Sequence, residues 1–230
     1  MAGAGASSSA GAGVGATAQA PVGRIAVPYP VNLLVDGRPC LVVGGGHVAA
    51  RKVAGLVACG ARVKVVAPSV GEEIRAQRGV AWEERAYQRA DLDGQRLVIA
   101  ATDDPTVNAA VYRDAEAAGV WVNGADDPAH CSFTLPSVVR RGALQLTVST
   151  GGRSPALARW LREWLESEIG PEYEVLLDLL ADERQSIRAT GRSTEDLDWQ
   201  SALDSDMLAL IRSGDVPQAK QRLRTCLSSS

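Results

Sequence analysis

A run of three glycines directly after a short apolar segment limits what this 230-residue chain can fold into. Residues Pro39–Val43 predict a buried strand, and Gly44–Gly46 follow it without a break. A helix is expected from His47 to Cys59, closed by Gly60, and a second strand from Arg62 to Val66. A strand, a tight turn, a helix and a parallel strand within about thirty residues form a βαβ unit. This unit predicts the opening of a Rossmann-type α/β domain.

The glycine turn fits the pattern G-x-G-x-x-A, which is typical of dinucleotide-binding loops when it joins a strand to a helix. Gly44 permits the tight turn, Gly46 lets the backbone approach a pyrophosphate, and Ala49 keeps the helix close to the strand. Backbone N–H groups at the start of the helix then face the phosphates. The alternative is a glycine-rich turn without a ligand. We expect NAD as the cofactor, held by Gly44, Gly45 and Gly46.

The end of the second strand lacks a residue that the fingerprint often carries. NAD-binding units place Asp or Glu there, to hold the 2′-hydroxyl of the ribose. This chain has Ala67, Pro68 and Ser69 at that point. Ser69 can hydrogen-bond a ribose, but it does not repel a 2′-phosphate by charge. The sequence therefore leaves the preference between NAD and NADP open.

Strands and helices continue to alternate after Ser69, which predicts a mostly parallel sheet with right-handed crossovers. The alternation of strands and helices then ends. Two extended runs follow with no helix between them, which favours antiparallel pairing of the two. Beyond these runs the chain is helical, and Ser154 and Pro155 are suited to begin the first helix. The expected elements are a helix over 71–78, strands over 80–84 and 97–101, a helix over 104–119, strands over 120–122, 132–139 and 143–149, and helices over 155–168, 172–189, 194–212 and 216–227.

These patterns divide the chain into four expected parts. Residues 1–27 form an Ala/Gly/Ser-rich tail without charge before Arg24, which predicts disorder rather than a signal peptide or membrane anchor. A Rossmann domain follows over 28–130, a strand-pair region over 131–154 and a helical domain over 155–230. No other segment reaches the apolar length of a membrane span, about 18 residues.

The net charge and the cysteine spacing argue against some kinds of partner and site. The net charge of −3 argues against a nucleic-acid or membrane partner, which would favour a basic excess. None of the four cysteines is in C-x-x-C spacing, so a structural zinc site is not expected. With no secretory signal, the expected compartment is the reducing cytoplasm.

Polar residues follow two later strands, where strand ends open onto the ligand crevice of such a sheet. Thr102 is placed to touch the cofactor, whereas Asp104 is either part of the site or the N-cap of the next helix. Asn123 precedes the adjacent carboxylates Asp126 and Asp127. The functional interpretation of this pair is a general base or a metal-facing carboxylate, and the alternative is an ordinary turn. A dedicated metal site is not expected, because Asp-x-x-His-Cys is not an established ligand spacing.

A third polar loop runs from Ser149 to Arg153 and leads into the helix at Pro155. Its backbone N–H groups and the Arg153 guanidinium are suited to bind an anion. The alternative is an ordinary N-capped loop.

Four ordered motifs together resemble the dehydrogenase/ferrochelatase module of the siroheme synthases, the precorrin-2 dehydrogenases. They read LVVGGGHVAARKV, VIAATDDPTVN, VNGADDPAHCSFTLPSVV and LTVSTGGRSPALARWLRE. The resemblance spans about residues 30–212, and four motifs at matching spacing are far more specific than the glycine loop. It implies NAD-dependent oxidation of precorrin-2 to sirohydrochlorin in siroheme biosynthesis. In many members Fe²⁺ is then inserted to give siroheme.

The resemblance also implies roles for single residues. Asp126 matches the family's key catalytic carboxylate, with Asn123 beside it in the substrate site. Thr150, after Ser149, matches the second hydroxyl of the family's Ser-Ser-Gly-Gly segment. Thr keeps the hydroxyl but adds a methyl group, which puts a regulatory role of this position in doubt. The substrate-binding residues expected on this basis are Asn123, Ser149, Thr150, Gly151 and Arg153.

The family's cofactor contacts map onto His47 and Val48 after the glycines, and onto Pro68 and Ser69 after the second strand. Some relatives carry Asp where this chain has His47, but His47 still offers its backbone N–H.

The implied reaction assigns a chemical role to these residues. Removal of a hydride leaves a cationic macrocycle that must lose a proton, and a carboxylate at Asp126 can stabilise that charge or accept the proton. The same carboxylate could accept pyrrole protons during metal insertion. The substrate carries several carboxylates, and arginine is suited to pair with them. The candidate partners are Arg140, Arg141, Arg153 and Arg159, and the alternative is that they are surface residues.

The resemblance further implies an interlocked homodimer, with the strand pair over 132–149 and the helix over 155–168 as dimer surfaces. A competing interpretation is an NAD-sensing regulatory module without catalysis, because Rossmann domains serve both roles. A sensor has no need for Asn123, Asp126 and the Ser149–Gly152 loop. A monofunctional dehydrogenase without chelatase activity shares every site residue with the bifunctional case.

Overall fold

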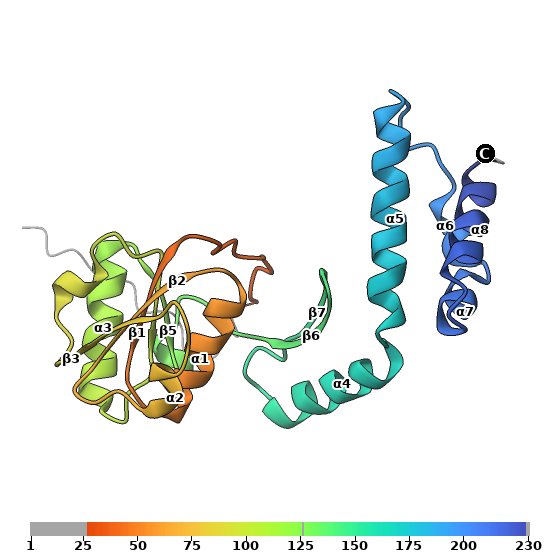
Figure 1. Ribbon diagram of the computed structural model, residues 1–230. Coiled ribbons are helices and arrows are strands. Elements are labelled where there is room, and N and C mark those ends of the chain that lie inside the picture. The colour runs from red at the N-terminus through yellow and green to blue at the C-terminus, as the bar shows by residue number, and fades with distance from the viewer. Residues whose placement is uncertain (1–26, 126, 229–230) are drawn as a thin grey trace, which may run out of the picture. The chain divides into compact units, whose positions relative to one another are not determined.

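The computed structural model describes residues 27–125 and 127–228 (Figure 1). The tail expected over 1–27 therefore lies outside the described residues except for Val27. The first regular element is the strand β1, Pro39–Val43, which follows a turn at Asp36–Gly37.

A parallel sheet of five strands, in the order β3-β2-β1-β4-β5, organises the N-terminal part of the described chain. Val42 of β1 pairs with Val65 on one side and Ile99 on the other, so β1 lies in the centre. The chain builds outward from β1 to β3 and then returns to β4, which puts the topological switch point between β1 and β4. Ligands bind at that point in sheets of this kind. The other strands are β2 Arg62–Ala67, β3 Ala81–Glu84, β4 Leu97–Ala100 and β5 Trp121–Gly124.

Helices cover both faces of this sheet, which confirms the predicted Rossmann-type fold (Figure 1). The helix α1, His47–Ala58, packs on one face against alternate side chains such as Val42 and Val65. The helix α3, Pro105–Ala118, packs on the other face, where Leu41 and Val66 point. Because both faces are buried, β1 and β4 are apolar throughout rather than alternating, whereas β2 carries Lys64.

Local signals fix where these helices begin and end. Asp104 caps α3 by accepting from the backbone N–H of Thr106 at 2.8 Å, and Pro105 occupies the first helical position. Gly119 ends α3 in the left-handed region, with φ +66°. The helix expected over 71–78 is shorter: α2 comprises only Glu72–Arg75. Beyond it, the side chain of Gln77 donates to the backbone of α1 instead of continuing a helix.

The strand pair is antiparallel, as predicted, but its first strand starts later than expected. The strands are β6, Ser137–Arg141, and β7, Leu144–Val148, joined by the turn Gly142–Ala143. Gly142 has a φ of +55°, which favours glycine in such a turn. The residues before β6 are tied to the sheet instead: the Ser132 hydroxyl accepts from the backbone N–H of Val122 at 2.7 Å.

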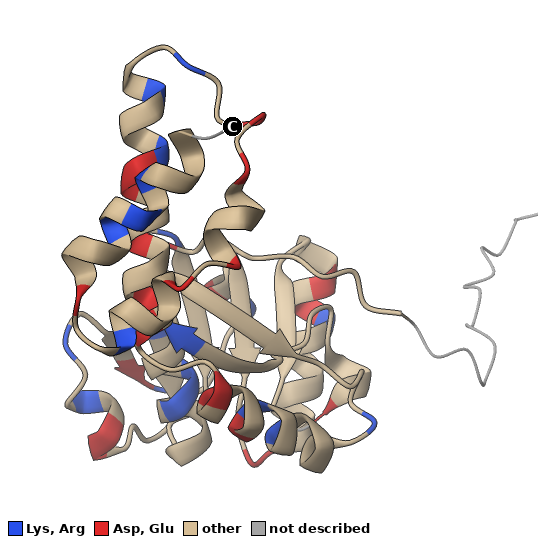
Figure 2. Ribbon diagram, turned by 90° about the vertical axis from the view of Figure 1, so that its right-hand side faces the viewer, with Lys and Arg blue, Asp and Glu red and all other residues tan. Residues whose placement is uncertain are grey.

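The C-terminal helices form a separate apolar core. The helix α4, Pro155–Glu168, starts at the predicted N-cap Ser154 and contacts the strand pair. The helix expected over 194–212 is in fact two, α6 and α7, separated by residues 204–206. Figure 2 shows basic and acidic residues interspersed along these helices. Their bounds are α5 Glu172–Ala189, α6 Trp199–Leu203, α7 Met207–Arg212 and α8 Val216–Ser228.

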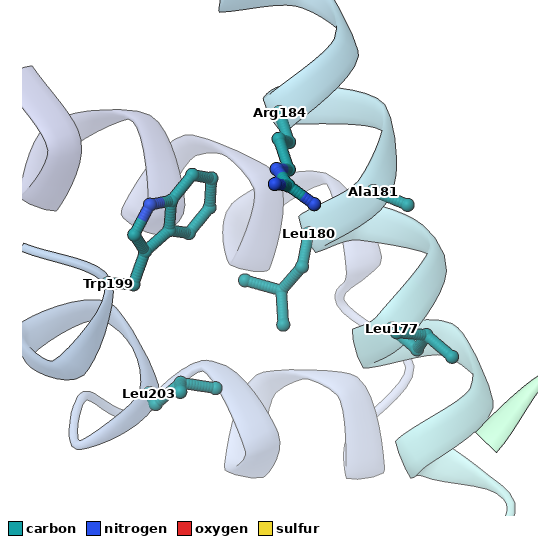
Figure 3. A pocket seen from close by; sticks show the side chains of 6 residues that line it. All are labelled: Leu177, Leu180, Ala181, Arg184, Trp199 and Leu203. Atoms are coloured by element: carbon teal, nitrogen blue, oxygen red, sulfur yellow. The ribbon is translucent and has the colours of Figure 1, made fainter. Parts of the chain in front are cut away.

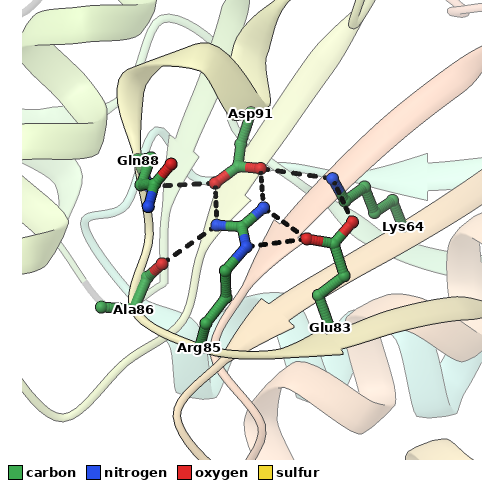
Figure 4. A network of polar contacts seen from close by, with 6 residues as sticks. All are labelled: Lys64, Glu83, Arg85, Ala86, Gln88 and Asp91. Atoms are coloured by element: carbon green, nitrogen blue, oxygen red, sulfur yellow. Dashed lines mark hydrogen bonds and ion pairs between the residues drawn. The ribbon is translucent and has the colours of Figure 1, made fainter.

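A network of charged side chains around Asp91 stabilises the edge of the sheet (Figure 4). The carboxylate of Asp91 is buried, in the short 3₁₀ helix η1, Arg89–Leu92. It accepts from the Arg85 guanidinium at 2.8 Å, from the Lys64 ammonium at 3.2 Å and from the backbone N–H of Gln88 at 2.9 Å. These contacts, the one from Arg85 above all, lower the pKa of Asp91 to about 2.

We predict that Asp91→Asn destabilises the fold by about 2 kcal/mol near neutral pH, because it removes one partner of a buried charged network. The folded pKa lies below the unfolded value of about 4. The stabilisation is therefore complete above about pH 4 and is lost as the pH falls toward 2. Urea unfolding across this pH range measures it.

The exposed neighbour Asp93 provides the control, because Asp93→Asn should change the unfolding free energy by less than about 0.5 kcal/mol. Equal effects of the two substitutions would contradict a special role for Asp91.

Candidate functional site

Two glycines of the loop are required by the protein's own packing. Gly44 has a φ of +129°, and a Cβ there would overlap the carbonyl oxygen of Ala101, after β4. A Cβ on Gly45 would overlap the carbonyl oxygen of Ser69, after β2. The backbone N–H of Gly71 also donates to the Gly45 carbonyl at 2.9 Å. The glycine loop therefore lies in direct backbone contact with the loops on either side of it.

Gly46 differs from its two neighbours, because nothing within the protein requires a glycine there. Its φ is −85°, which any residue adopts, and among the described residues nothing lies within 4 Å of a Cβ built on it. Gly46 precedes α1, whose first N–H groups, including those of His47 and Val48, lack acceptors within the helix. An open position without a side chain beside unpaired N–H groups fits the pyrophosphate of NAD.

The other expected cofactor residues lie where the neighbouring strands end. Pro68 and Ser69 are exposed directly after β2. Thr102 follows β4 and is held by Asn108 of α3: the Thr102 hydroxyl donates to Asn108 Oδ1 at 2.8 Å, and Asn108 Nδ2 donates to the Thr102 carbonyl at 2.9 Å. Asn108 was not among the predicted site residues. The signal for it is the Thr-Asp-Asp-Pro-Thr-Val-Asn spacing, which places its amide one turn into the helix.

Of the two alternatives for Asp104, the structure favours the helix cap. Its carboxylate accepts from the hydroxyl and the backbone N–H of Thr106, at 2.6 and 2.8 Å. The hydroxyl contact is the main reason that the pKa of Asp104 lies below its usual range.

Asn123 is buried at the end of β5 and braces the chain that follows. Its Nδ2 donates to the carbonyl of Phe133 at 2.9 Å and to Cys131 Sγ at 3.4 Å. Burial of the Cys131 thiol raises its pKa. The backbone N–H of Ala125 donates to the carbonyl of Ala100 at 2.8 Å, which ties this segment to β4. The expected catalytic residue Asp126 lies outside the described residues.

The adjacent carboxylate, Asp127, is engaged by a histidine. His130 Nδ1 lies 2.5 Å from Asp127 Oδ2, and the His130 ring meets Tyr112 edge to face with centroids 5.0 Å apart. The contact with His130 is the main reason that the pKa of Asp127 is lowered. Asp127 therefore already has a partner.

The polar loop before α4 is organised by its own hydroxyls. The Thr150 hydroxyl donates to the carbonyl of Ser154 and accepts from its backbone N–H, both at 3.2 Å. The Ser149 hydroxyl accepts from the N–H of Gly151 at 3.3 Å. Ser149, Gly151 and Arg153 are exposed, whereas Thr150 is half-buried. Thr150 thus shapes the loop, and the exposed residues offer polar groups to a ligand.

The four arginines proposed as partners of substrate carboxylates have different surroundings. Arg141 donates to the carbonyls of Ile169 and Glu166, at 2.7 and 2.9 Å, and so caps the C-terminal end of α4. Arg159 forms an ion pair with Glu163 at 2.8 Å on the same helix. Arg140 and Arg153 are exposed. Arg141 therefore has a structural role, and the Arg159 side chain is exposed and paired with Glu163.

The described part of the chain also forms a pocket of about 320 Å³ between C-terminal helices (Figure 3). None of its lining residues is an expected site residue. They are Leu177, Leu180, Ala181, Arg184, Trp199 and Leu203. Within residues 27–125 and 127–228, no group of three or more His, Cys, Asp or Glu could hold a metal ion. None of the helices described there is long and apolar enough to cross a membrane.

Comparison with known proteins connects this site to a family. Residues 31–137 match a family model described as "Putative NAD(P)-binding", and residues 141–168 match one described as "Sirohaem biosynthesis protein central". A siroheme synthase of Nitrosococcus oceani is 41% identical over 203 residues, which cover 86% of this chain and 43% of that protein. The chain thus carries the NAD(P)-binding and central regions that are matched in siroheme synthases.

A second curated relative and a solved structure match the chain over a similar range. Siroheme synthase 2 of Aeromonas hydrophila is 40% identical over 206 residues, covering 87% of this chain and 44% of that protein. The chain thus spans less than half the length of these curated relatives. Among solved structures, "SirC, precorrin-2 dehydrogenase" matches with a TM-score of 0.63 and 26% identity, over 88% of this chain and 100% of that chain. The Rossmann domain is accordingly assigned to the NAD(P)-binding class.

We predict that Gly46→Ala weakens NAD⁺ binding at least about tenfold, because a methyl group at the open position keeps a pyrophosphate from the backbone. The loss of stability should stay within about 1 kcal/mol, the difference between Gly and Ala at an N-cap. Isothermal titration calorimetry and urea unfolding measure the two effects.

Gly55→Ala, an exposed position in the same helix with nothing within 4 Å of its Cβ among the described residues, is the matched control. It should leave the NAD⁺ affinity unchanged. Unaltered binding by Gly46→Ala would show that the loop does not hold the pyrophosphate.

Proposed function

We propose that this chain oxidises precorrin-2 to sirohydrochlorin in siroheme biosynthesis, with NAD⁺ as the hydride acceptor. The observation that carries the proposal is the glycine loop, where Gly46 is open on the ligand side although no packing within the protein requires a glycine. Support also comes from the likeness to a structure titled precorrin-2 dehydrogenase, over the whole of that chain. The reaction removes one hydride and one proton from the macrocycle.

In this proposal the residues around β1 and β4 bind and orient the cofactor. The backbone N–H groups of His47 and Val48 hold the pyrophosphate, and Pro68 and Ser69 line the adenosine side. Thr102, fixed by its bonds to Asn108, borders the crevice after β4. When bound, NAD⁺ supplies an electrophilic ring that accepts the hydride.

The proton of the reaction needs an acceptor, and we assign that role to Asp126. The segments on both sides of it are held: Ala125 is bonded to β4, and Asp127 pairs with His130. Since Asp127 has a partner, Asp126 is the carboxylate of the pair that we expect to act on substrate. A carboxylate there also stabilises the cation left by hydride removal.

We propose that the substrate carboxylates are met by the loop Ser149–Arg153, through the exposed Ser149, Gly151 and Arg153. We also propose Fe²⁺ insertion into sirohydrochlorin as a second activity, because the named relatives are siroheme synthases. In that step Asp126 would accept the pyrrole protons, and Fe²⁺ is a substrate.

The replacement Asp126→Ala tests the catalytic assignment. We expect NAD⁺ affinity to change less than about twofold, and sirohydrochlorin formation to fall by at least the hundredfold typical of a lost general base. Calorimetry gives the first quantity, and absorbance of the macrocycle under anaerobic conditions gives the second.

Asp127→Asn is the matched control, because it removes the neighbouring charge and should retain turnover. Full turnover by Asp126→Ala would refute the role of that carboxylate. A wild-type chain that binds NAD⁺ yet leaves precorrin-2 unchanged would instead favour a regulatory NAD sensor.

We further propose that the chain works as a homodimer, built through the strand-pair region over 131–154 and the helix α4. Leu157, Trp160 and Trp164 on α4 are each about half exposed, a concentration of large apolar side chains that marks an interface. An isolated strand pair is also marginally stable without a partner surface. We place the protein in the cytoplasm, because its four cysteines are free thiols, as a reducing compartment favours.

We predict that the wild-type protein sediments at about twice its chain mass of 24.1 kDa. Trp160→Glu should shift it toward the monomer, because a charge at the centre of an apolar interface is costly. The control Arg159→Ala alters an exposed, charged side chain of the same helix and should leave the dimer intact. A monomeric wild type at micromolar concentration would contradict the proposed interface.

A further inference from the structure

The fold brings the acidic residue Glu73 close to the glycine loop. The sequence pattern alone does not place a carboxylate at the end of β2. The second strand ends at Ala67, and the three positions from there carry no carboxylate. Glu73, in the helix α2 that follows, hydrogen-bonds to His47, the first residue of α1. The carboxylate therefore connects the loop after β2 with the helix start after the glycines.

The backbone of Glu73 is held in place by contacts on both sides. Gly71 N–H donates to the Gly45 carbonyl at 2.9 Å, which fixes the start of α2 on the glycine loop. Ile74 is fully buried in the core under α1. Gln77 Nε2 donates to the carbonyl of Ala50 at 3.2 Å. These contacts fix the distance between α2 and the first turn of α1.

The Glu73 side chain is oriented by His47. His47 Nδ1 lies 3.0 Å from Glu73 Oε2 and 3.2 Å from Oε1. Both side chains are largely exposed, at 69% for His47 and 62% for Glu73. A contact between two side chains this exposed adds little to stability, so the fold does not depend on it. His47 directly follows Gly46, and Gly71, two residues before Glu73, bonds to Gly45, which itself packs against Ser69 after β2. In Rossmann domains the adenosine ribose is bound between the glycine loop and the end of the second strand.

We propose that Glu73, positioned by His47, accepts a hydrogen bond from the 2′-hydroxyl of the NAD ribose and disfavours binding of the 2′-phosphate of NADP. Glu73 would thus replace the acidic residue that the end of β2 lacks. The inference rests on the cofactor role of the glycine loop and is independent of the substrate proposed above.

The charges around Glu73 fit this selectivity. A 2′-phosphate carries between one and two negative charges at neutral pH, and a carboxylate beside it repels it. A cation could offset that repulsion, but Arg75 of the same helix is committed elsewhere. Its guanidinium donates to Glu84 at 2.6 Å and to the carbonyl of Val70 at 3.0 Å. Glu72 adds a further negative charge to α2.

Binding of NAD⁺ and NADP⁺ to the full chain tests the inference without any turnover. For the wild type we expect tighter binding of NAD⁺. Glu73→Gln should lower the ratio of the NADP⁺ to the NAD⁺ dissociation constant by about tenfold or more, mostly through tighter NADP⁺ binding. Glu72→Gln removes the same charge one residue away and should leave the ratio within about twofold, because it is Glu73 that bonds to His47.

Substitution of the histidine separates positioning from a merely structural contact. His47→Ala should lower the same ratio in part, and His47→Gln, which keeps a donor for Glu73, should restore it. An unchanged ratio in Glu73→Gln, with the wild type still binding NAD⁺, would overturn this inference alone. A wild type that binds neither dinucleotide would overturn the cofactor assignment together with it.

Discussion

The backbone contacts of the glycine loop are the constraint on which the rest of the site depends. Gly44 and Gly45 lie so close to the carbonyl oxygens of Ala101 and Ser69 that neither position has room for a side chain. This packing holds the ends of β1, β2 and β4 together. It leaves Gly46 and the start of α1 open to a ligand. The same closeness brings α2, and with it Glu73, against the first turn of α1.

Several polar residues near the strand ends hydrogen-bond to neighbouring segments of the protein. These side chains therefore have structural roles. Asn108 fixes Thr102, Asn123 ties Phe133 to β5, and Asp127 holds His130. Of these residues Asn123 is buried, and a buried polar group needs such partners because an unpaired one costs free energy. The residues that remain for chemistry are therefore fewer than the polar clusters of the sequence indicate. This supports the choice of Asp126 over its neighbour as the proton acceptor.

Much of the fold could be predicted from sequence, because β1 and β4 are buried and apolar throughout. The parallel sheet and the limits of α1 and α3 followed from such runs and from capping residues such as Asp104 and Gly119. Less could be predicted where tertiary contacts override local preference. Residues 132–136 precede the strand pair, and Ser132 bonds to Val122 of β5 instead of pairing with β7. The helix expected over 194–212 breaks in two. Glu73 was missed because its role depends on a contact 26 residues away along the chain.

If a dinucleotide held at this loop takes a hydride from a tetrapyrrole, its reduced form and the oxidised macrocycle must form in one reaction. The most direct measurement is anaerobic incubation of the purified chain with precorrin-2 and NAD⁺, in which NADH and sirohydrochlorin are quantified from the same sample. We expect both products to appear together, in equal amounts. Binding of NAD⁺ without either product, or sirohydrochlorin formed without NADH, would contradict it.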